Sequence, residues 1–245
     1  SRGLGDVYKR QILLLIAYNH NANSLYVISG NAYGTTWSVS SPQYIADNHK
    51  EAIKDIINDI DYIASNYKSK SEISKINLNF KQFQFVSDDL FEILKIAKSV
   101  EDISDGYYNI MLGKISSSLG FAPDFGKKSL QKKLSTYELD EKNNSLIRYS
   151  ENWFDLSSIA KGYAVQKIHE YLTLSNLNNH LIDIGGELII SGSKNGKPWN
   201  IGIQNPLSNI DSSTTTINNE NNDFLAIATS GAVSYTHLRA HETLN

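Results

Sequence analysis

The 245-residue chain contains no cysteine. This absence excludes disulfide bonds, thiolate zinc sites, iron–sulfur clusters and a cysteine nucleophile. The chain also lacks an excess of positive charge, since 23 lysines and arginines are set against 26 aspartates and glutamates for a net charge of -3. The basic residues are scattered among acidic ones and form no basic stripe, so we expect no nucleic-acid partner.

A long apolar run is missing as well. Residues 12–18 (ILLLIAY) are too few to span a bilayer, which takes about 20 residues. With the mostly polar residues 19–24 after it, the run resembles the remaining end of an export signal, and a buried strand is the alternative interpretation. We therefore expect export to the periplasm or cell surface of a bacterium. No cysteine follows the run, so the sequence does not support a lipid anchor.

The two ends of the chain resemble translated sequencing-adapter read-through. We expect residues 1–11 (SRGLGDVYKRQ) and residues 232–245 to be foreign, residues 12–24 to be a partial signal and spacer, and residues 25–231 to form the folded domain. His237 and His241 are spaced to share one helical face, as in half a metal site. Their place in the suspect tail makes a foreign or disordered segment the preferred interpretation.

Residues 25–231 mix the patterns of strands and helices, and 40% apolar content suffices for one domain or two small lobes. Apolar residues recur every three and four positions over residues 46–67, which predicts a helix, and a second helix is predicted after the N-cap Ser87, with Gly106 at or after its end. The predicted strands cover residues 25–29, 35–41, 137–149, 153–155, 180–191, 199–203 and 224–229.

Turns and loops complete this pattern. A hairpin is expected around Gly30 and Gly34, a turn at residues 141–144, a hairpin at Asn195-Gly196 and a surface loop over residues 209–223. Because helices and strands do not alternate regularly, the pattern predicts an α+β fold of mixed sheets with packed helices. No G-x-G-x-x-G follows a predicted strand, which argues against a dinucleotide-dependent dehydrogenase.

Residues 154–165 (FDLSSIAKGYAV) carry the strongest chemical signal. A strand ending at Asp155 and a helix starting near Ser157 leave free backbone N–H groups at the helix start, where a phosphate group can bind. Lys161 adds a positive charge that favours an anion at the same end. The alternative is a capped helix with a solvated lysine, and composition alone does not separate the two.

The ordered set of motifs in this chain resembles the ApbE family of FAD:protein FMN transferases. The matching segments are YGTTWSV, SNYKSKSEISKIN, DLSSIAKGYAV, IDIGGE, GKPWNIGIQNP and AIATSG, which together span residues 33–231. Each motif alone is weak, whereas the ordered set is specific. The resemblance implies a T-fold-like, two-lobed single domain.

The resemblance also implies an activity. It is the Mg²⁺-dependent cleavage of the FAD pyrophosphate and transfer of FMN to a threonine or serine hydroxyl of a target flavoprotein, with release of AMP. FAD is then a substrate, Mg²⁺ the cofactor, and the protein partner an acceptor flavoprotein with a Thr/Ser flavinylation motif, such as a subunit of a membrane-associated redox complex. Phosphoryl transfer of this kind depends on charge neutralisation and alignment.

Site residues follow from the resemblance position by position. Ser158 matches a Mg²⁺ ligand that acts through its backbone carbonyl, which suits a hard cation. Tyr67 matches a tyrosine of the flavin pocket, and the alternative is that it ends the apolar face of a helix. The residues matched to FAD-binding positions are Tyr33, Tyr67, Tyr107, Tyr108, Asn109, Asp155, Lys161 and Thr229.

The sequence departs from the family in three places. Tyr33 replaces the usual methionine, and in GYYNIMLG, where the family has a motif like GAFDPTVG, Asn109 replaces an aspartate and Met111 a threonine. Nothing after Gly231 matches the family's histidine and D-P-x-T-G stretch, so no catalytic base is identified. We expect the chain as written to bind Mg²⁺ poorly and to be inactive, although its full-length parent is an enzyme. The open alternatives are a non-catalytic FAD-binding protein and an FAD pyrophosphatase that releases FMN and AMP.

Overall fold

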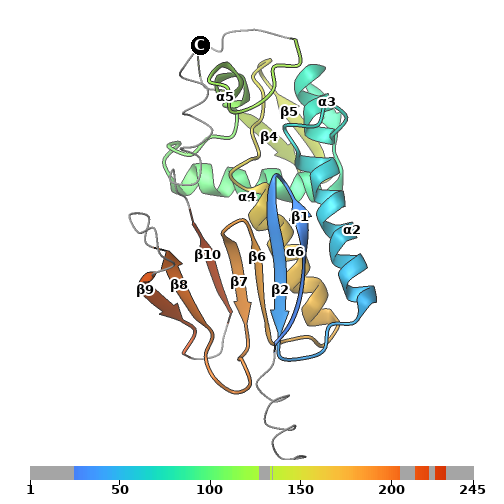
Figure 1. Ribbon diagram of the computed structural model, residues 1–245. Coiled ribbons are helices and arrows are strands. Elements are labelled where there is room, and N and C mark those ends of the chain that lie inside the picture. The colour runs from blue at the N-terminus through green and yellow to red at the C-terminus, as the bar shows by residue number, and fades with distance from the viewer. Residues whose placement is uncertain (1–24, 127–132, 134, 205–212, 221–223, 230–245) are drawn as a thin grey trace, which may run out of the picture. The chain divides into compact units, whose positions relative to one another are not determined.

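The computed structural model describes residues 25–126, 133, 135–204, 213–220 and 224–229 (Figure 1). The predictions for residues 1–11, 12–24 and 232–245 therefore lie outside the described residues. The chain divides into two compact units, one formed by residues 1–50 and 168–245 and the other by residues 51–167. Both combine helices with open antiparallel sheets, which confirms the α+β class. Within the described ranges, no helix has the length and apolar character needed to cross a membrane.

The first unit is built on a five-stranded antiparallel sheet (Figure 1). Its order is β1-β2-β6-β7-β10, formed by β1 (Tyr26–Ala32), β2 (Thr35–Ser41), β6 (His180–Ile184), β7 (Glu187–Ser191) and β10 (Leu225–Ala228). Side chains alternate between the two faces of each strand. Trp37 and Val39 of β2 are buried and pair with Ile184 and Ile182 of β6, which are buried too. The WSVS alternation of the sequence therefore marks the core face of this sheet.

Helix α6 (Ala160–Leu174) enters this unit with its second half. Ile168 and Leu172 are fully buried, and the Tyr171 hydroxyl lies 2.9 Å from Nδ1 of His49 in the first turn of α2 (Asp47–Ala64). A two-stranded ribbon of β8 (Asn200–Gln204) and β9 (Ser213–Asn218) completes the described part of the unit. The contact between His49 and Tyr171 joins the start of α2 to the end of α6 within the first unit.

Three predictions for the first unit are wrong in detail. The expected hairpin forms with Gly34 in its turn, but the first strand extends to Ala32, so Gly30 lies inside β1 beside the Trp37 indole. Residues 180–191 form two strands, because Gly185 and Gly186 take positive φ values of 57° and 91° and turn the chain between β6 and β7. The predicted loop over residues 209–223 contains β9, whose threonines favour extended backbone once β8 supplies a partner.

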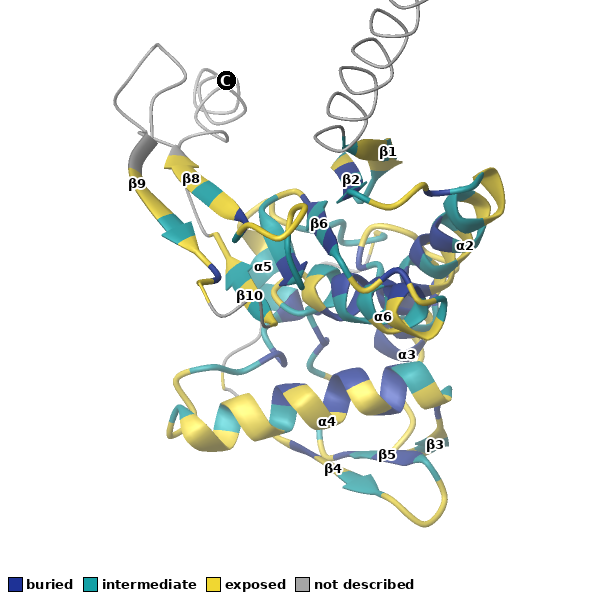
Figure 2. Ribbon diagram, turned by 90° about the horizontal axis from the view of Figure 1, so that it is seen from below, coloured by how far each residue is buried: buried dark blue, intermediate teal, exposed yellow. Residues whose placement is uncertain are grey.

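The second unit packs helices on a small antiparallel sheet of order β3-β5-β4 (Figure 2). Its elements are the rest of α2, α3 (Glu72–Leu78), β3 (Phe83–Phe85), α4 (Asp88–Ile103), α5 (Gly113–Ser118), β4 (Tyr137–Asp140) and β5 (Ser145–Arg148). The Tyr137 hydroxyl donates to the Leu94 carbonyl at 2.7 Å and so joins the sheet to α4. The Tyr137 ring also meets Phe154 edge to face at 5.3 Å, inside the same core.

The predicted helix boundaries hold best where capping residues mark them. The Ser87 hydroxyl accepts from the Leu90 N–H at 3.3 Å and begins α4, as expected. Gly106 follows α4 with a φ of 80°, and residues 141–144 turn the chain between β4 and β5. By contrast, residues 153–155 form no strand, and α6 begins at Ala160, three residues after Ser157.

Candidate functional site

In the second unit, the segment before α6 brings three predicted site residues together. The Asp155 carboxylate accepts the Ser157 N–H at 2.9 Å, so this carboxylate, and not the Ser157 hydroxyl, closes the turn that leads toward α6. The Tyr108 hydroxyl lies 3.0 Å from the Ser158 hydroxyl. The Tyr108 and Ser158 hydroxyls are thus in contact on the loop that precedes the helix, and the Asp155 carboxylate closes a turn of the same loop.

Tyr108 reaches this segment because the loop after α4 is bonded to it through the backbone. Asp155 N donates to the Ile110 carbonyl at 2.6 Å, and Gly113 N donates to the Trp153 carbonyl at 2.8 Å. The Tyr108 N–H is taken up by the Ser104 hydroxyl at 2.9 Å. The GYYNIMLG and FDLSS segments are therefore joined by backbone hydrogen bonds and form parts of the same site.

Burial and charge keep the Tyr108 phenol neutral. Burial raises the pKa of Tyr108, and the nearby Asp155 carboxylate raises it further, while the hydrogen bond with Ser158 lowers it. A neutral phenol both donates and accepts a hydrogen bond. Tyr108 can therefore orient the Ser158 side chain.

Lys161 is the second residue of α6, in the first turn, where the Ala160 N–H already donates to the Leu156 carbonyl at 2.9 Å. The positive end of the helix dipole and the charge of Lys161 favour an anion at this end of the helix. The arrangement suits a phosphate group of a ligand. The contact of Lys161 with FAD stays a prediction.

Asn109 and Tyr107 play different parts in the loop. The Asn109 amide donates to Glu101 Oε1 at 3.0 Å and accepts the Met111 N–H at 2.8 Å, so its side chain fixes the loop from inside. Tyr107 is 95% exposed beside it. An aspartate at position 109 would face the Glu101 carboxylate. In this chain, asparagine is thus the residue that fits the neighbouring acid.

Tyr67 lies beyond the end of α2, which stops at Ala64. It is 63% exposed, and its hydroxyl donates to the Phe121 carbonyl at 2.6 Å. The alternative interpretation, that Tyr67 ends the buried face of a helix, is therefore wrong. The contact of Tyr67 with a flavin stays a prediction.

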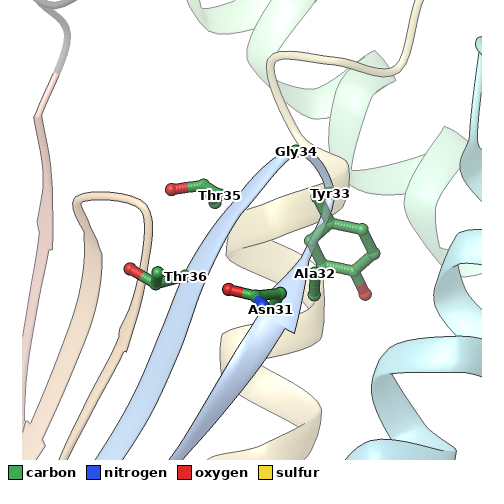
Figure 3. Close-up of a pocket in the computed structure, with 6 residues that line it drawn as sticks. All are labelled: Asn31, Ala32, Tyr33, Gly34, Thr35 and Thr36. Carbon is green, nitrogen blue, oxygen red and sulfur yellow. The ribbon is translucent and has the colours of Figure 1, made fainter.

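The other two predicted site residues, Tyr33 and Thr229, lie in the first unit at one end of its sheet. Tyr33 and Gly34 form the two-residue turn between β1 and β2, with φ values of 53° and 73° that match a type I′ hairpin. A hollow of about 430 Å³ lies at this turn, lined by residues 31–36 (Figure 3). In Figure 3 the Tyr33 ring lies on one side of the hairpin, and the Thr35 and Thr36 side chains lie on the other.

The glycine turn between β6 and β7 lies at the same end of the sheet. Gly185 N donates to the Thr36 carbonyl at 3.1 Å, and a Cβ on Gly185 would lie 2.6 Å from the Thr35 side chain. Thr229 N donates to the Gly186 carbonyl at 3.1 Å, which fixes the end of β10. The three strand ends thus bring the YGTT, IDIGGE and AIATSG motifs together. Thr35 and Thr36 were not singled out in the sequence, although they belong to the first motif.

The oxygen donors near α6 agree with magnesium in type, because Mg²⁺ prefers carboxylate, carbonyl and hydroxyl oxygens. They do not form a complete site within the described residues, where no cluster of three or more acidic or histidine side chains is found. Ser158 therefore remains a predicted ligand. His237 and His241 lie outside the described residues.

Two further residues complete the second unit's site, and sequence reasoning missed their role. Asn66 and Asn77 are buried and hydrogen bond to the backbone of residues 154–156. Both lie in the SNYKSKSEISKIN motif. The signal available in the sequence was an asparagine on the apolar face of a helix, beside Ile73 and Ile76, where an unpaired amide is costly.

Comparisons with known proteins agree with these motifs. A model of the ApbE family matches residues 33–244. An FAD:protein FMN transferase of Haemophilus influenzae is 29% identical over 204 residues, covering 73% of this chain and 58% of that protein. A protein of the same name from Vibrio cholerae is 28% identical over 236 residues, covering 90% of this chain and 70% of that protein. The chain thus spans little more than half the length of the Haemophilus relative.

Solved structures show the same fold. The flavin transferase ApbE from Vibrio cholerae superposes with a TM-score of 0.71 at 24% identity, covering 86% of this chain and 72% of that one. The ApbE protein from Thermotoga maritima also gives a TM-score of 0.71 at 24% identity, over 85% of this chain and 71% of that one. At this identity the likeness establishes the fold alone.

Proposed function

We propose that this chain, which belongs to the ApbE family, functions in the transfer of FMN from FAD to a hydroxyl group of an acceptor protein. In this reaction the hydroxyl oxygen of the acceptor forms a bond to the FMN phosphorus, and the bond between that phosphorus and the bridging oxygen of the pyrophosphate breaks. AMP leaves with the bridging oxygen, and the hydroxyl proton passes to a base. Mg²⁺, when bound, neutralises the pyrophosphate charge.

The single observation that carries this proposal is the joining of the GYYNIMLG and FDLSS segments at the start of α6. There the Tyr108 and Ser158 hydroxyls lie 3.0 Å apart, next to the Asp155 turn and the positive end of the α6 dipole. Such groups bind and align a phosphate-bearing ligand. Lys161, two residues into the helix, balances part of its charge. The acceptor supplies the threonine or serine hydroxyl.

Two other functions share this site. A non-catalytic FAD-binding protein is favoured by Asn109, whose side chain is engaged with Glu101 and Met111 inside the loop. Hydrolysis of FAD to FMN and AMP would use the same phosphate-binding groups with water in place of the acceptor. The three functions differ in their products, so product analysis separates them.

The test uses the purified full-length parent protein, since the chain as written is expected to be inactive, with FAD, MgCl₂ and an acceptor domain bearing a flavinylation threonine. Intact-mass spectrometry follows the acceptor, and chromatography follows AMP. An acceptor mass gain of one FMN phosphoester, lost in the acceptor's Thr→Ala variant, supports the transferase. AMP without a mass gain supports hydrolysis, and FAD binding with neither product supports the non-catalytic protein. A chain that binds no FAD with or without Mg²⁺ overturns all three.

The partner and the location of the protein belong to the same proposal. The acceptor is a flavoprotein with a Thr/Ser motif, such as a subunit of a membrane-associated redox complex, and we place both proteins on the exported side of the membrane. The support is the apolar run at residues 12–18 and the family resemblance. Fractionation of cells that produce the tagged protein tests this location, because recovery from the cytoplasm alone would contradict it.

A further inference from the structure

The backbone around Asp155 is held by two asparagine side chains. The Asn77 amide accepts the Phe154 N–H at 2.8 Å and donates to the Phe154 carbonyl at 2.9 Å. A strand neighbour exchanges the same pair of bonds with the residue opposite it in an antiparallel sheet. One side chain thus supplies what a neighbouring strand would, which explains why residues 153–155 have the sequence of a strand without being one.

Asn66 holds the other side of Asp155. Its amide donates to the Phe154 carbonyl at 2.7 Å and accepts the Leu156 N–H at 2.8 Å. The Phe154 carbonyl therefore receives two hydrogen bonds, one from each asparagine. The Asp155 N–H between them donates to the Ile110 carbonyl at 2.6 Å. The peptide groups on both sides of Asp155 are fixed in orientation.

Both asparagines are themselves held in place. Asn66 and Asn77 are only 7% and 6% exposed; Asn66 lies just after α2, and Asn77 lies in the last turn of α3. The Ser71 and Ser74 hydroxyls donate to the Ser65 carbonyl at 2.6 and 3.1 Å, and these bonds tie the start of α3 to the residues that follow α2. Buried amides that make all their bonds to backbone define one geometry, because any other leaves a buried polar group unpaired.

We propose that Asn66 and Asn77 are positioning residues, which hold residues 154–156 so that Asp155 and the start of α6 are presented to FAD. The identity of the ligand, FAD, rests on the proposed function. The positioning role rests on the hydrogen bonds that the two asparagines make to residues 154–156. Every hydrogen bond described for the two side chains goes to the backbone of residues 154–156, so the proposed role is to position this segment. A displacement of even about 1 Å in a group that orients a reacting ligand lowers its effect severalfold to a hundredfold.

The test compares single variants of the full chain. Asn77→Leu and Asn66→Leu keep the side-chain size and remove the hydrogen bonds. Asn79→Leu is the matched control, because Asn79 lies on the same segment, is exposed, and bonds only to the Lys75 carbonyl of its own helix. Ile73→Val, at a fully buried position of α3, controls for a loss of stability that leaves the asparagines intact.

Two measurements are made on each variant. Hydrogen exchange of single amides should accelerate at Phe154 in Asn77→Leu and at Leu156 in Asn66→Leu, with no change in Asn79→Leu. The Kd for FAD, measured by fluorescence quenching with MgCl₂, should rise about tenfold or more in both asparagine variants. Ile73→Val should lower the melting temperature without raising the Kd.

The outcomes separate this inference from the proposed function. Unchanged exchange at Phe154 and Leu156, or a rise in Kd no larger than that of Ile73→Val, would overturn the positioning role. Wild-type chain that binds no FAD would overturn the proposed function and the ligand part of this inference, while the exchange result would still decide whether the asparagines hold the segment. If Asn77→Leu fails to fold, Asn66→Leu carries the same test at Leu156.

Discussion

Nε2 of His180 lies 2.9 Å from Nδ1 of His169 in the first unit, and Nδ1 of His180 lies 2.6 Å from the Leu177 carbonyl. A carbonyl only accepts, so Nδ1 of His180 carries the proton and Nε2 accepts from His169. His180 is fully buried, and burial lowers its pKa to about 4, with a further contribution from His169.

This pair predicts a loss of stability in mild acid. The unfolded chain protonates His180 near its usual pKa of about 6.5, whereas the folded chain resists protonation until the pH is near 4. The stabilisation is complete above the unfolded pKa and is lost as the pH falls through this window, by at most about 3 kcal/mol. Urea unfolding from pH 7.5 to 4.5 measures it. His180→Asn, which keeps a donor for the Leu177 carbonyl, should flatten the dependence, and an unchanged slope would contradict the assignment.

Removing one hydroxyl tests the contact between Tyr108 and Ser158. Tyr108→Phe should weaken FAD binding severalfold, because the Ser158 side chain loses its partner at 3.0 Å. The unfolding free energy should change by only about 1 kcal/mol, the net value of a single hydrogen bond. Isothermal titration with FAD and MgCl₂, together with thermal melts, gives both numbers. Tyr44→Phe, at a 66% exposed tyrosine outside the predicted site, is the control and should leave both unchanged.

Alanine substitutions at two glycines with positive φ, Gly34 and Gly185, distinguish the cost of backbone strain from the cost of a steric clash. A Cβ on Gly34 would meet no atom within 4 Å, whereas a Cβ on Gly185 would lie 2.6 Å from Thr35. Gly34→Ala should therefore cost about 1 kcal/mol through strain alone, and Gly185→Ala about 2 to 4 kcal/mol through strain and a clash at the sheet end. Urea unfolding compares the two. Equal losses would mean that Thr35 moves aside freely.

Local patterns in the sequence predicted the helices and the central strands well. The isoleucine spacing of α2, the Ser87 cap of α4 and the WSVS alternation of β2 each depend on residues near one another in the chain. These features need no knowledge of distant contacts. The α+β class follows from them, and the structural neighbours agree with it.

Features that depend on distant partners were predicted less well. Residues 153–155 have the composition of a strand, but their hydrogen bonds go to Asn77, Asn66 and Ile110, which no local pattern reveals. In the same way, β9 forms in a Ser/Thr-rich stretch because β8 lies beside it. Asp155, Ser158 and Tyr108 were named from the family motifs, and the structure brings those three together in one unit. Their contacts with FAD and Mg²⁺ stay predictions.

Arg148 offers a last test of how the site segment is held, since no carboxylate of the described residues is bonded to its buried guanidinium. Nη1 donates to the Ile76 carbonyl at 2.7 Å and Nη2 to the Asn152 carbonyl at 2.6 Å, with the Phe80 and Phe154 rings at 5.3 and 5.4 Å. Burial lowers the pKa of Arg148 to about 10, so the group stays charged at neutral pH.

Replacing Arg148 should therefore show whether the forked geometry matters beyond the charge. A lysine keeps the charge but presents one ammonium group, which cannot hold both carbonyls in the same plane. We expect Arg148→Lys to lose about 2 kcal/mol of unfolding free energy and Arg148→Met about 3 kcal/mol, because buried carbonyls are left unpaired. Urea unfolding at pH 7.5 measures both losses. If Arg148→Lys is as stable as wild type, the charge alone suffices, and the bridge from Ile76 to Asn152 contributes nothing to holding the segment that precedes Asp155.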